Sequence, residues 1–156
     1  MSNQSNKRTL MRTYRVELIK ETSKLYDLPS KGIIRSPHDA YDIFKKVLNY
    51  ERMSREHLML ATLNTKNKVT GLHIVHVGTL NSSVVHPRDV FQHALLDNAS
   101  SIILAHNHPS GDTTPSQEDV QVTKRMEEVA NILGIKLLDH IILGDGHTSL
   151  REVGDL

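Results

Sequence analysis

Two histidines separated by a single residue, His106 and His108, stand directly after the apolar run of residues 101–105. If this run is a strand, side chains two residues apart point to the same side, so both imidazoles leave its carboxyl end together. Asp119 follows eleven residues after His108, in the first turn of an expected helix, where the helix dipole favours an ionised carboxylate. Two neutral imidazoles and one carboxylate match an open tetrahedral zinc site, whose fourth position is left for water. The spacing therefore predicts a metal centre suited to hydrolysis.

A hydrolase of this kind also needs a carboxylate that takes a proton from water and passes it to the leaving amine. We assign this role to Glu56, which precedes the expected strand His57–Leu63 and can emerge at the metal end of the sheet. From spacing alone, Glu51, Asp112 and Glu118 are comparable candidates. The metal also has an alternative, because two histidines and one carboxylate suit non-haem Fe(II).

Proline and cap residues mark the starts of three helices. We expect the first to begin after Ser36, at Pro37, and the second to run from Pro87 to near Asn98. The third has four signals, which are Thr114 as the cap, Pro115 at the first position, Gln117 completing a capping box and Gly134 as the stop.

Apolar and β-branched runs supply the expected strands. His57–Leu63 and Val69–Val77 are separated by the turn at residues 64–67 and predict a β-hairpin. Strands and helices alternate, but one pair of strands is a hairpin, so the sequence predicts an α/β fold with a mixed sheet covered by helices. The other expected strands are an edge strand at residues 14–19, then 101–105, 135–143 and 148–152.

The composition excludes several classes of function. The chain has 19 basic and 18 acidic side chains, and its formal net charge of +1 gives no support for a dedicated binder of phosphate backbones. It has no cysteine, which excludes thiolate zinc fingers and iron–sulfur clusters and argues against the usual site of zinc deaminases. The polar N-terminus lacks a secretory signal and no run reaches membrane-spanning length, so we expect a cytoplasmic protein without a membrane partner.

Longer strings in the sequence resemble a known family. His106-Asn107-His108-Pro109, followed by the string from Ser116 to Asp119, is similar to the His-x-His-Pro plus Ser-x-x-Asp signature of the JAMM (MPN) metalloproteases. Residues 78–88, 105–111 and 138–142 resemble the RadC branch, which carries asparagine between the two histidines where the deubiquitinating members usually have serine. The resemblance covers roughly residues 35–154.

This resemblance implies a three-layer α/β/α fold like that of the cytidine deaminases. It implies a zinc ion held by His106, His108 and Asp119, with Glu56 as acid/base and Ser116 as the residue that steadies the tetrahedral oxyanion. The implied reaction is hydrolysis of an amide, peptide or isopeptide bond, with a peptide or protein as the substrate.

The domain division follows from the extent of the resemblance. We expect a polar leader with an edge strand at residues 1–34 and a RadC-like JAMM domain at residues 35–156. Full-length RadC proteins carry an N-terminal helix-hairpin-helix region, and residues 1–34 are too short and too polar to contain one.

The motif residues are also compatible with roles outside catalysis. Asp119 can serve as a capping carboxylate, and Ser116 can satisfy backbone amides instead of contacting substrate. The chain can also be a DNA-repair-associated module that binds nucleic acid or protein and has a mainly structural metal. A catalytically silent scaffold is a third hypothesis. Nucleic-acid binding would use a weak basic arm formed by Lys7, Arg8, Arg12 and Arg15.

The remaining histidines have ordinary structural interpretations. His86 precedes Pro87, so we expect it to cap that helix or to contact the site from outside the ligand set. His73 and His76 lie on the second hairpin strand and are expected to face solvent. No role is assigned to His57, His140 and His147, which lack a spaced carboxylate partner.

Overall fold

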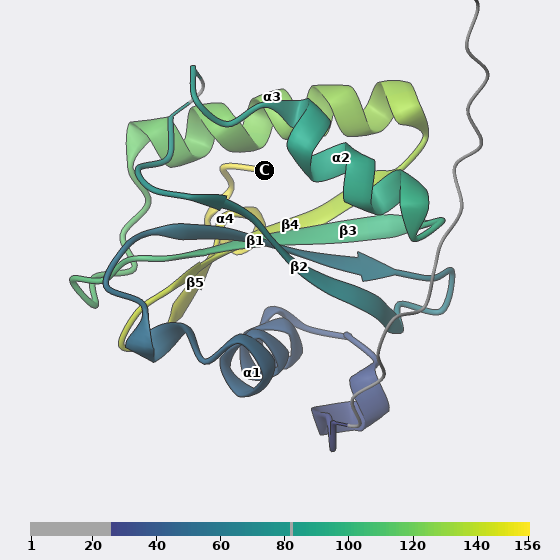
Figure 1. Ribbon diagram of the computed structural model, residues 1–156, viewed down its shortest axis with the longest axis horizontal. Coiled ribbons are helices and arrows are strands. Elements are labelled where there is room, and N and C mark those ends of the chain that lie inside the picture. The colour runs from purple at the N-terminus through teal and green to yellow at the C-terminus, as the bar shows by residue number, and fades with distance from the viewer. Residues whose placement is uncertain (1–25, 82) are drawn as a thin grey trace, which may run out of the picture.

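A mixed sheet with helices on both faces organises the described part of the molecule (Figure 1). The computed structural model describes residues 26–81 and 83–156. Within these residues, five strands form one sheet in the order β2-β1-β3-β4-β5. Helix α1 covers one face, and helices α2 and α3 cover the other (Figure 1). The predicted α/β class, with a mixed sheet between helical layers, is confirmed.

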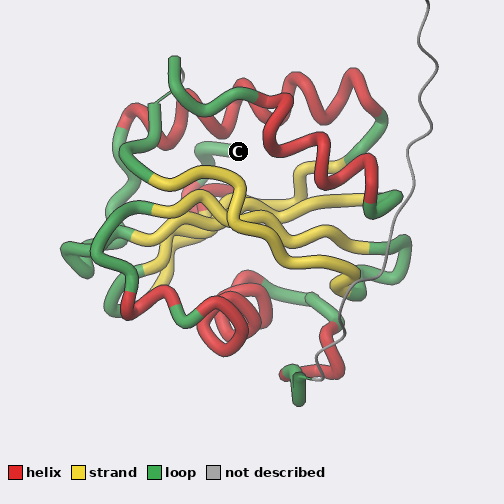
Figure 2. Tube along the Cα trace, in the orientation of Figure 1, coloured by secondary structure: helices red, strands yellow, loops and turns green. Residues whose placement is uncertain are grey.

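The strands combine antiparallel and parallel pairs, and Figure 2 shows them in yellow between the helices. The predicted hairpin is present, because β1 (His57–Leu63) pairs antiparallel with β2 (Val69–Val77). On its other side β1 pairs antiparallel with β3 (Ser101–Asn107). The connection from β3 to β4 (Lys136–Leu143) passes through α3, and these two strands are parallel.

The antiparallel pairing of β1 with β3 decides which residues meet at one end of the sheet. Leu58, near the start of β1, is paired with His106, near the end of β3. Glu56 lies just before β1 in the chain. The sheet therefore brings Glu56 to the end where the two spaced histidines leave β3.

Two of the helix starts agree with the prediction. Helix α1 (Pro37–Leu48) begins after Ser36, whose hydroxyl accepts the N–H of Asp39 while the Asp39 carboxylate accepts the N–H of Ser36. Helix α2 (Pro87–Leu96) begins at its proline. Short 3-10 turns at Pro29–Gly32 and Tyr50–Arg52 lie on either side of α1.

Successive side chains of the central strands point to opposite faces of the sheet, so a hydrophobic core forms on each face. Leu60 of β1 belongs to the cluster formed with α2 and α3, whereas its neighbours Met59 and Ala61 belong to the cluster formed with α1. Full burial of a leucine of this kind stabilises a fold by about 1.5–3 kcal/mol. On β3, Leu104 lies in the α2/α3 cluster, so His106, two residues later, faces α3 as well.

The start of α3 (Gln117–Leu133) differs from the prediction. The helix is capped by Ser116 and not by Thr114, and its capping box is completed by Asp119 and not by the glutamine. The reason is a separate turn before the helix, in which the Asp112 carboxylate accepts the N–H and the hydroxyl of Thr114 at 2.9 and 2.7 Å. With that threonine engaged, the next serine becomes the cap.

The last predicted strand, residues 148–152, is wrong in its second half. Strand β5 (His147–Ser149) is short, and the chain turns at once into α4 (Leu150–Val153). The hydroxyl of Ser149 accepts the N–H of Glu152 at 3.1 Å, which caps a helical turn and removes that N–H from the sheet.

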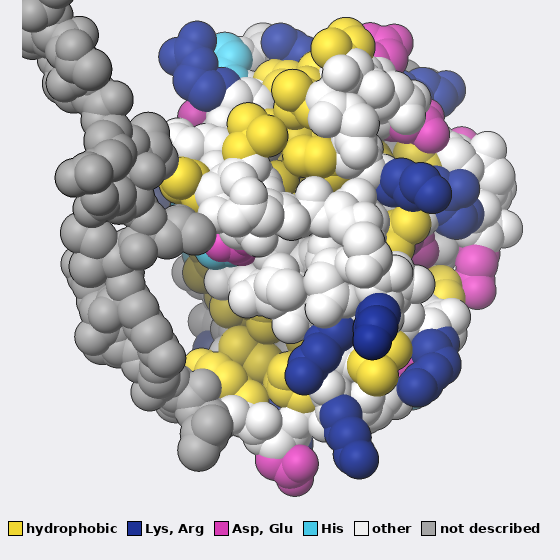
Figure 3. All heavy atoms as spheres, turned by 90° about the vertical axis from the view of Figure 1, so that its right-hand side faces the viewer, with side chains coloured by type: hydrophobic (Ala, Val, Ile, Leu, Met, Phe, Trp, Pro, Cys, Tyr) yellow, Lys and Arg dark blue, Asp and Glu magenta, His cyan; other side chains and the backbone are white. Residues whose placement is uncertain are grey.

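Several side chains lie where the sequence did not place them. Leu95 of α2 is apolar but 54% exposed. Figure 3 shows hydrophobic side chains that reach the surface on one side of the molecule. His73 and His76 do not simply face solvent, because β2 packs against α2. The Nε2 of His73 lies 2.7 Å from the Asp97 carboxylate, and the Nε2 of His76 is buried. His86 occupies the cap position of α2, but its side chain makes no capping hydrogen bond.

Some predictions fall outside the described residues. They are the expected edge strand at residues 14–19 and the basic arm of Lys7, Arg8, Arg12 and Arg15. Among residues 26–81 and 83–156, no helix combines the length and the apolar character needed to cross a bilayer.

Candidate metal centre

The three predicted ligands lie together at the end of β3. The Nε2 of His106 lies 2.8 Å from the Nε2 of His108 and 3.1 Å from an Asp119 oxygen. The Nε2 of His108 lies 3.5 Å from the other oxygen of that carboxylate. One donor atom from each residue is within 4.8 Å of the others, so this group can hold a metal ion. Tetrahedral ligands about 2.0–2.1 Å from zinc stand about 3.3 Å apart, and these spacings fit that requirement.

Asp119 serves the helix and the cluster at the same time. Its Oδ2 accepts the N–H of Ser116 at 2.7 Å, and its own N–H donates to the Ser116 hydroxyl at 3.1 Å. Its Oδ1 meanwhile faces His106. The reciprocal cap fixes the direction of the carboxylate, and the helix N-terminus favours its ionised form. The capping and the ligand interpretations of Asp119 are therefore compatible.

In both histidines the Nδ1 atom forms a hydrogen bond with a group outside the three-residue cluster. The Nδ1 of His108 lies 2.6 Å from the backbone oxygen of Asp112, which can only accept, so this nitrogen carries the proton. In a neutral imidazole the Nε2 then has a free lone pair, and this is the atom that faces Asp119. The Nδ1 of His106 lies 2.8 Å from the Nε2 of His140. Each histidine thus turns its Nε2 toward the same carboxylate.

The charge of the cluster favours a cation. Burial would raise the pKa of Asp119, but hydrogen bonds with His106 and His108 outweigh burial and hold this pKa well below its usual range. The hydrogen bond to Asp119 in turn raises the pKa of His108. An ionised carboxylate that is only 3% exposed therefore lies beside two imidazoles, and either protons or a metal ion can balance its charge.

Glu56 and Ser116 line the same cavity, of about 480 Å³, as His108 and Asp119. The Glu56 carboxylate is held in place by the backbone, because its Oε2 accepts the N–H of Leu80 at 3.2 Å. The structure thus brings the two residues predicted to act in catalysis to the cluster predicted to bind metal.

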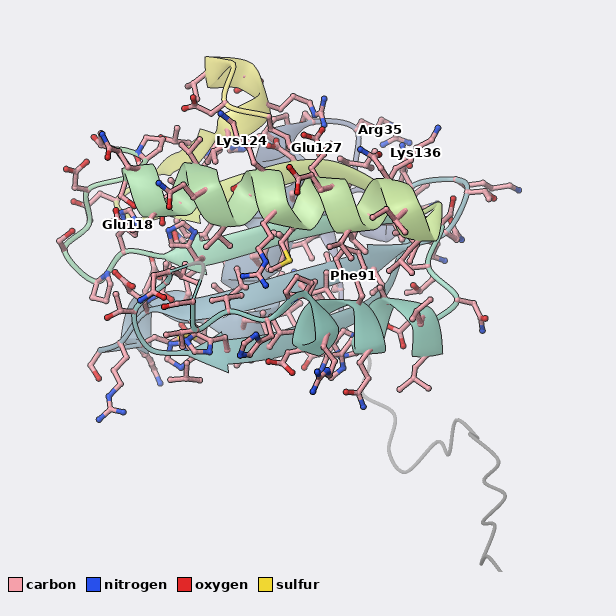
Figure 4. All side chains as sticks on the ribbon, turned by 90° about the horizontal axis from the view of Figure 1, so that it is seen from above. Arg35, Phe91, Glu118, Lys124, Glu127 and Lys136 are labelled. Atoms are coloured by element: carbon pink, nitrogen blue, oxygen red, sulfur yellow. The ribbon has the colours of Figure 1, made fainter. Side chains whose placement is uncertain are left out.

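The rival carboxylates are placed differently. Glu118 lines the same cavity as Glu56, and its side chain lies at the start of α3 (Figure 4). Glu51 lines a neighbouring cavity of about 240 Å³ and forms an ion pair with Lys45 at 3.0 Å. Asp112 is engaged in the turn before α3. Glu56 and Glu118 are therefore the non-ligand carboxylates of the larger cavity.

Sequence reasoning missed the role of Asn107, which ties the Glu56 segment to β3. Its Oδ1 accepts the N–H of His57 at 2.8 Å, and its Nδ2 donates to the backbone oxygen of Arg55 at 3.0 Å. These partners flank Glu56 in the chain, so one amide side chain fixes the backbone on both sides of it. The contact joins residues about 50 positions apart, and no local pattern could have indicated it.

Sequence reasoning also missed His140 and Thr123, which lie behind His106. All three side chains are fully buried. The Nδ1 of His140 lies 2.6 Å from the Thr123 hydroxyl, which donates to the backbone oxygen of Asp119 at 2.6 Å. Burial holds the pKa of His140 well below its usual value. A lone histidine inside an apolar strand was the available signal, because a buried polar side chain needs a partner.

The fold and the site together define a mixed α/β protein with a two-histidine, one-carboxylate group at the end of a central strand. Residues 34–155 match a family model described as the RadC-like JAB domain. The chain belongs to the RadC family.

Relatives in the same family are about half identical to this chain. A UPF0758 protein of Caldanaerobacter subterraneus subsp. tengcongensis is 52% identical over 122 residues, which are 78% of this chain and 52% of the relative. A UPF0758 protein of Moorella thermoacetica is 52% identical over 79% of this chain and 53% of its own length. UPF0758 protein YsxA of Bacillus subtilis is 47% identical over 80% of this chain and 53% of its own length. The chain thus spans about half the length of the curated relatives it matches.

Proposed function

We propose that this chain is a zinc-dependent hydrolase that cleaves amide bonds of peptides or isopeptide bonds of proteins. The observation that supports the proposal best is the convergence of two imidazole nitrogens on one buried carboxylate, at 3.1 and 3.5 Å. Nitrogen and oxygen donors in this number match an open zinc site, in which His106, His108 and Asp119 would hold the ion. Membership of the RadC-like JAB family supports the same reaction class.

Glu56 and Ser116 supply the catalytic groups other than the metal. Zinc, when bound, lowers the pKa of a coordinated water to about 7 and polarises the substrate carbonyl. Glu56, in the same cavity as the ligands, takes a proton from water and passes it to the leaving nitrogen. The hydroxyl of Ser116 accepts the N–H of Asp119, which leaves its hydrogen free to donate to the oxygen of a tetrahedral intermediate.

Two cavities that meet beside the cluster support a peptide as the substrate. The 480 Å³ cavity with Glu56 and the 240 Å³ cavity with Glu51 share the lining segment from His108 to Ser110. A chain that crosses this segment would place one residue in each cavity and a peptide bond beside His108. We therefore propose a peptide or protein as the substrate.

A cleavage assay tests this function. The zinc-loaded protein is incubated with a mixture of unstructured peptides and lysine-linked isopeptides, and the products are identified by mass spectrometry. Glu56→Gln should reduce the rate by about 10²–10⁴-fold, the usual contribution of a general acid/base. The matched control Glu128→Gln changes an exposed carboxylate of α3 that lines neither cavity, and it should leave the rate within about threefold of wild type, because surface changes of this kind have small effects. Cleavage that is equally fast in Glu56→Gln would contradict the assigned mechanism.

A further inference from the structure

A continuous chain of hydrogen bonds runs through the protein interior behind His106. It starts at the backbone oxygen of Asp119, which accepts from the Thr123 hydroxyl at 2.6 Å. The Thr123 oxygen lies 2.6 Å from the Nδ1 of His140, and the Nε2 of His140 lies 2.8 Å from the Nδ1 of His106. The chain thus begins and ends on two residues of the candidate metal centre.

With His140 neutral, one arrangement of protons satisfies every hydrogen bond of this series. A backbone oxygen can only accept, so the hydroxyl hydrogen of Thr123 points to Asp119 and its oxygen is left as an acceptor. The Nδ1 of His140 must then carry hydrogen and donate to Thr123. Because a charge on the fully buried His140 would be costly, its imidazole is neutral, and its Nε2 has a lone pair that accepts from the Nδ1–H of His106 at 2.8 Å. When His106 is neutral, its lone pair is therefore on Nε2, the atom that faces Asp119.

We propose that Thr123 and His140 are positioning residues that fix the tautomer and ring orientation of His106, so that its Nε2 is available to a metal ion. This inference rests on the proposed zinc site but not on any particular substrate. Histidine ligands of metals ordinarily donate their second N–H to a carboxylate, a backbone oxygen or water. Here the acceptor is a neutral imidazole, whose own tautomer is imposed by a hydroxyl on α3.

This arrangement of protons predicts how His140 and His106 respond when the Thr123 hydroxyl is lost. Without the Thr123 hydroxyl, His140 can move its hydrogen to Nε2, which would then oppose the Nδ1–H of His106. His106 would respond by moving its own hydrogen to Nε2, the position required for metal. Thr123 makes no contact with the proposed ion, yet it controls whether the ligand is in the right form.

Threonine variants test the proposal without removing a ligand. Thr123→Val keeps the β-branched shape and loses the hydroxyl, whereas Thr123→Ser keeps the hydroxyl. Thr62→Val is the matched control, because Thr62 is also fully buried and donates its hydroxyl at 2.7 Å to Asp97, away from the cluster. Zinc affinity of the full chain is measured by competition with a chromophoric chelator. We expect Thr123→Val to weaken zinc binding by about 10–100-fold and Thr123→Ser to restore most of it.

Nitrogen-15 NMR of the imidazoles in the metal-free full chain gives a second readout that is independent of catalysis. In the wild type, both His106 and His140 should carry hydrogen on Nδ1. In Thr123→Val the two residues should show mixed or reversed tautomers, whereas Thr62→Val should keep the wild-type pattern.

The two readouts separate failure of this inference from failure of the proposed function. Wild-type spectra in which the Nδ1 of His106 lacks hydrogen, or zinc binding by Thr123→Val that equals that of wild type, would overturn the positioning role. An equal loss of affinity in Thr62→Val would overturn it as well, because a general loss of stability would then account for the effect. Absence of peptide cleavage would contradict the hydrolase proposal and leave the tautomer result intact.

Discussion

Replacing Asn107 by alanine should separate catalysis from metal binding. The side chain is 2% exposed and joins the N–H of His57 and the backbone oxygen of Arg55 to β3 at 2.8 and 3.0 Å. Its removal leaves two peptide groups without partners at the edge of the core. At about 1 kcal/mol for each hydrogen bond, the free energy of unfolding should fall by about 2 kcal/mol.

The same substitution should slow the reaction, because Glu56 lies between those two peptide groups in the chain. A displacement of about 1 Å in a catalytic group costs up to about 100-fold in rate, so we expect kcat to fall by between about 10-fold and 100-fold. The zinc dissociation constant should stay within about threefold of wild type, since the Asn107 side chain hydrogen-bonds to His57 and Arg55 and not to a ligand, and most effects away from a contact are small.

The assay combines urea unfolding, chelator competition and single-turnover cleavage of a peptide found by the substrate screen. Asn64→Ala is the matched control, because Asn64 also binds two backbone N–H groups, those of Lys66 and Lys68, in the β1–β2 turn away from the site. It should lose stability but keep kcat. If Asn107→Ala keeps the wild-type kcat, or if zinc affinity falls in parallel with kcat, the positioning of Glu56 by Asn107 is refuted.

Three further predictions follow from other contacts. Ser116→Ala removes the α3 cap and the proposed oxyanion donor, so urea unfolding should show a loss of about 1 kcal/mol and kcat should fall by at least about 100-fold; a change in stability alone would leave only the capping role. Burial raises the pKa of Asp139, so the folded protein holds this proton more tightly than the unfolded chain and its stability contribution is lost as the pH rises through the folded pKa. Melting curves should therefore show that Asp139→Asn gains stability relative to wild type as the pH rises above the ordinary carboxyl pKa of 3.8, and a pH-independent difference would contradict this. Gly144→Ala would place a Cβ 2.3 Å from the backbone oxygen of Gly111, and a loss of about 1–3 kcal/mol in urea unfolding is expected; wild-type stability would show that the β3–α3 loop can move aside.

Local patterns in the sequence were sufficient for the hairpin, for the starts of the first two helices and for the grouping of His106, His108 and Asp119. The hairpin strands are bounded by turn residues, and the first helix by a serine cap and a proline, so their limits depend on neighbours in the chain. His106 and His108 could be paired because a strand turns alternate side chains to one side, and Asp119 because a helix start follows.

Features that depend on distant contacts could not be predicted in the same way. The cap of α3 moved from Thr114 to Ser116 because a preceding carboxylate competes for the threonine, and both residue types are favoured caps. The roles of Asn107 and His140 depend on which strands are neighbours and in which register they pair. A one-residue shift in that register would send either side chain to the opposite face of the sheet.

The most direct test of the proposed metal centre is a crystal of the full chain grown with zinc, with anomalous diffraction collected at the zinc edge. We predict one strong peak between His106, His108 and Asp119, with room for water on the side of Glu56, and we predict that His108→Ala crystals lack it. A peak elsewhere, no peak at all, or a fourth protein ligand that closes the site would contradict the hydrolase account and favour a binding module with a structural metal.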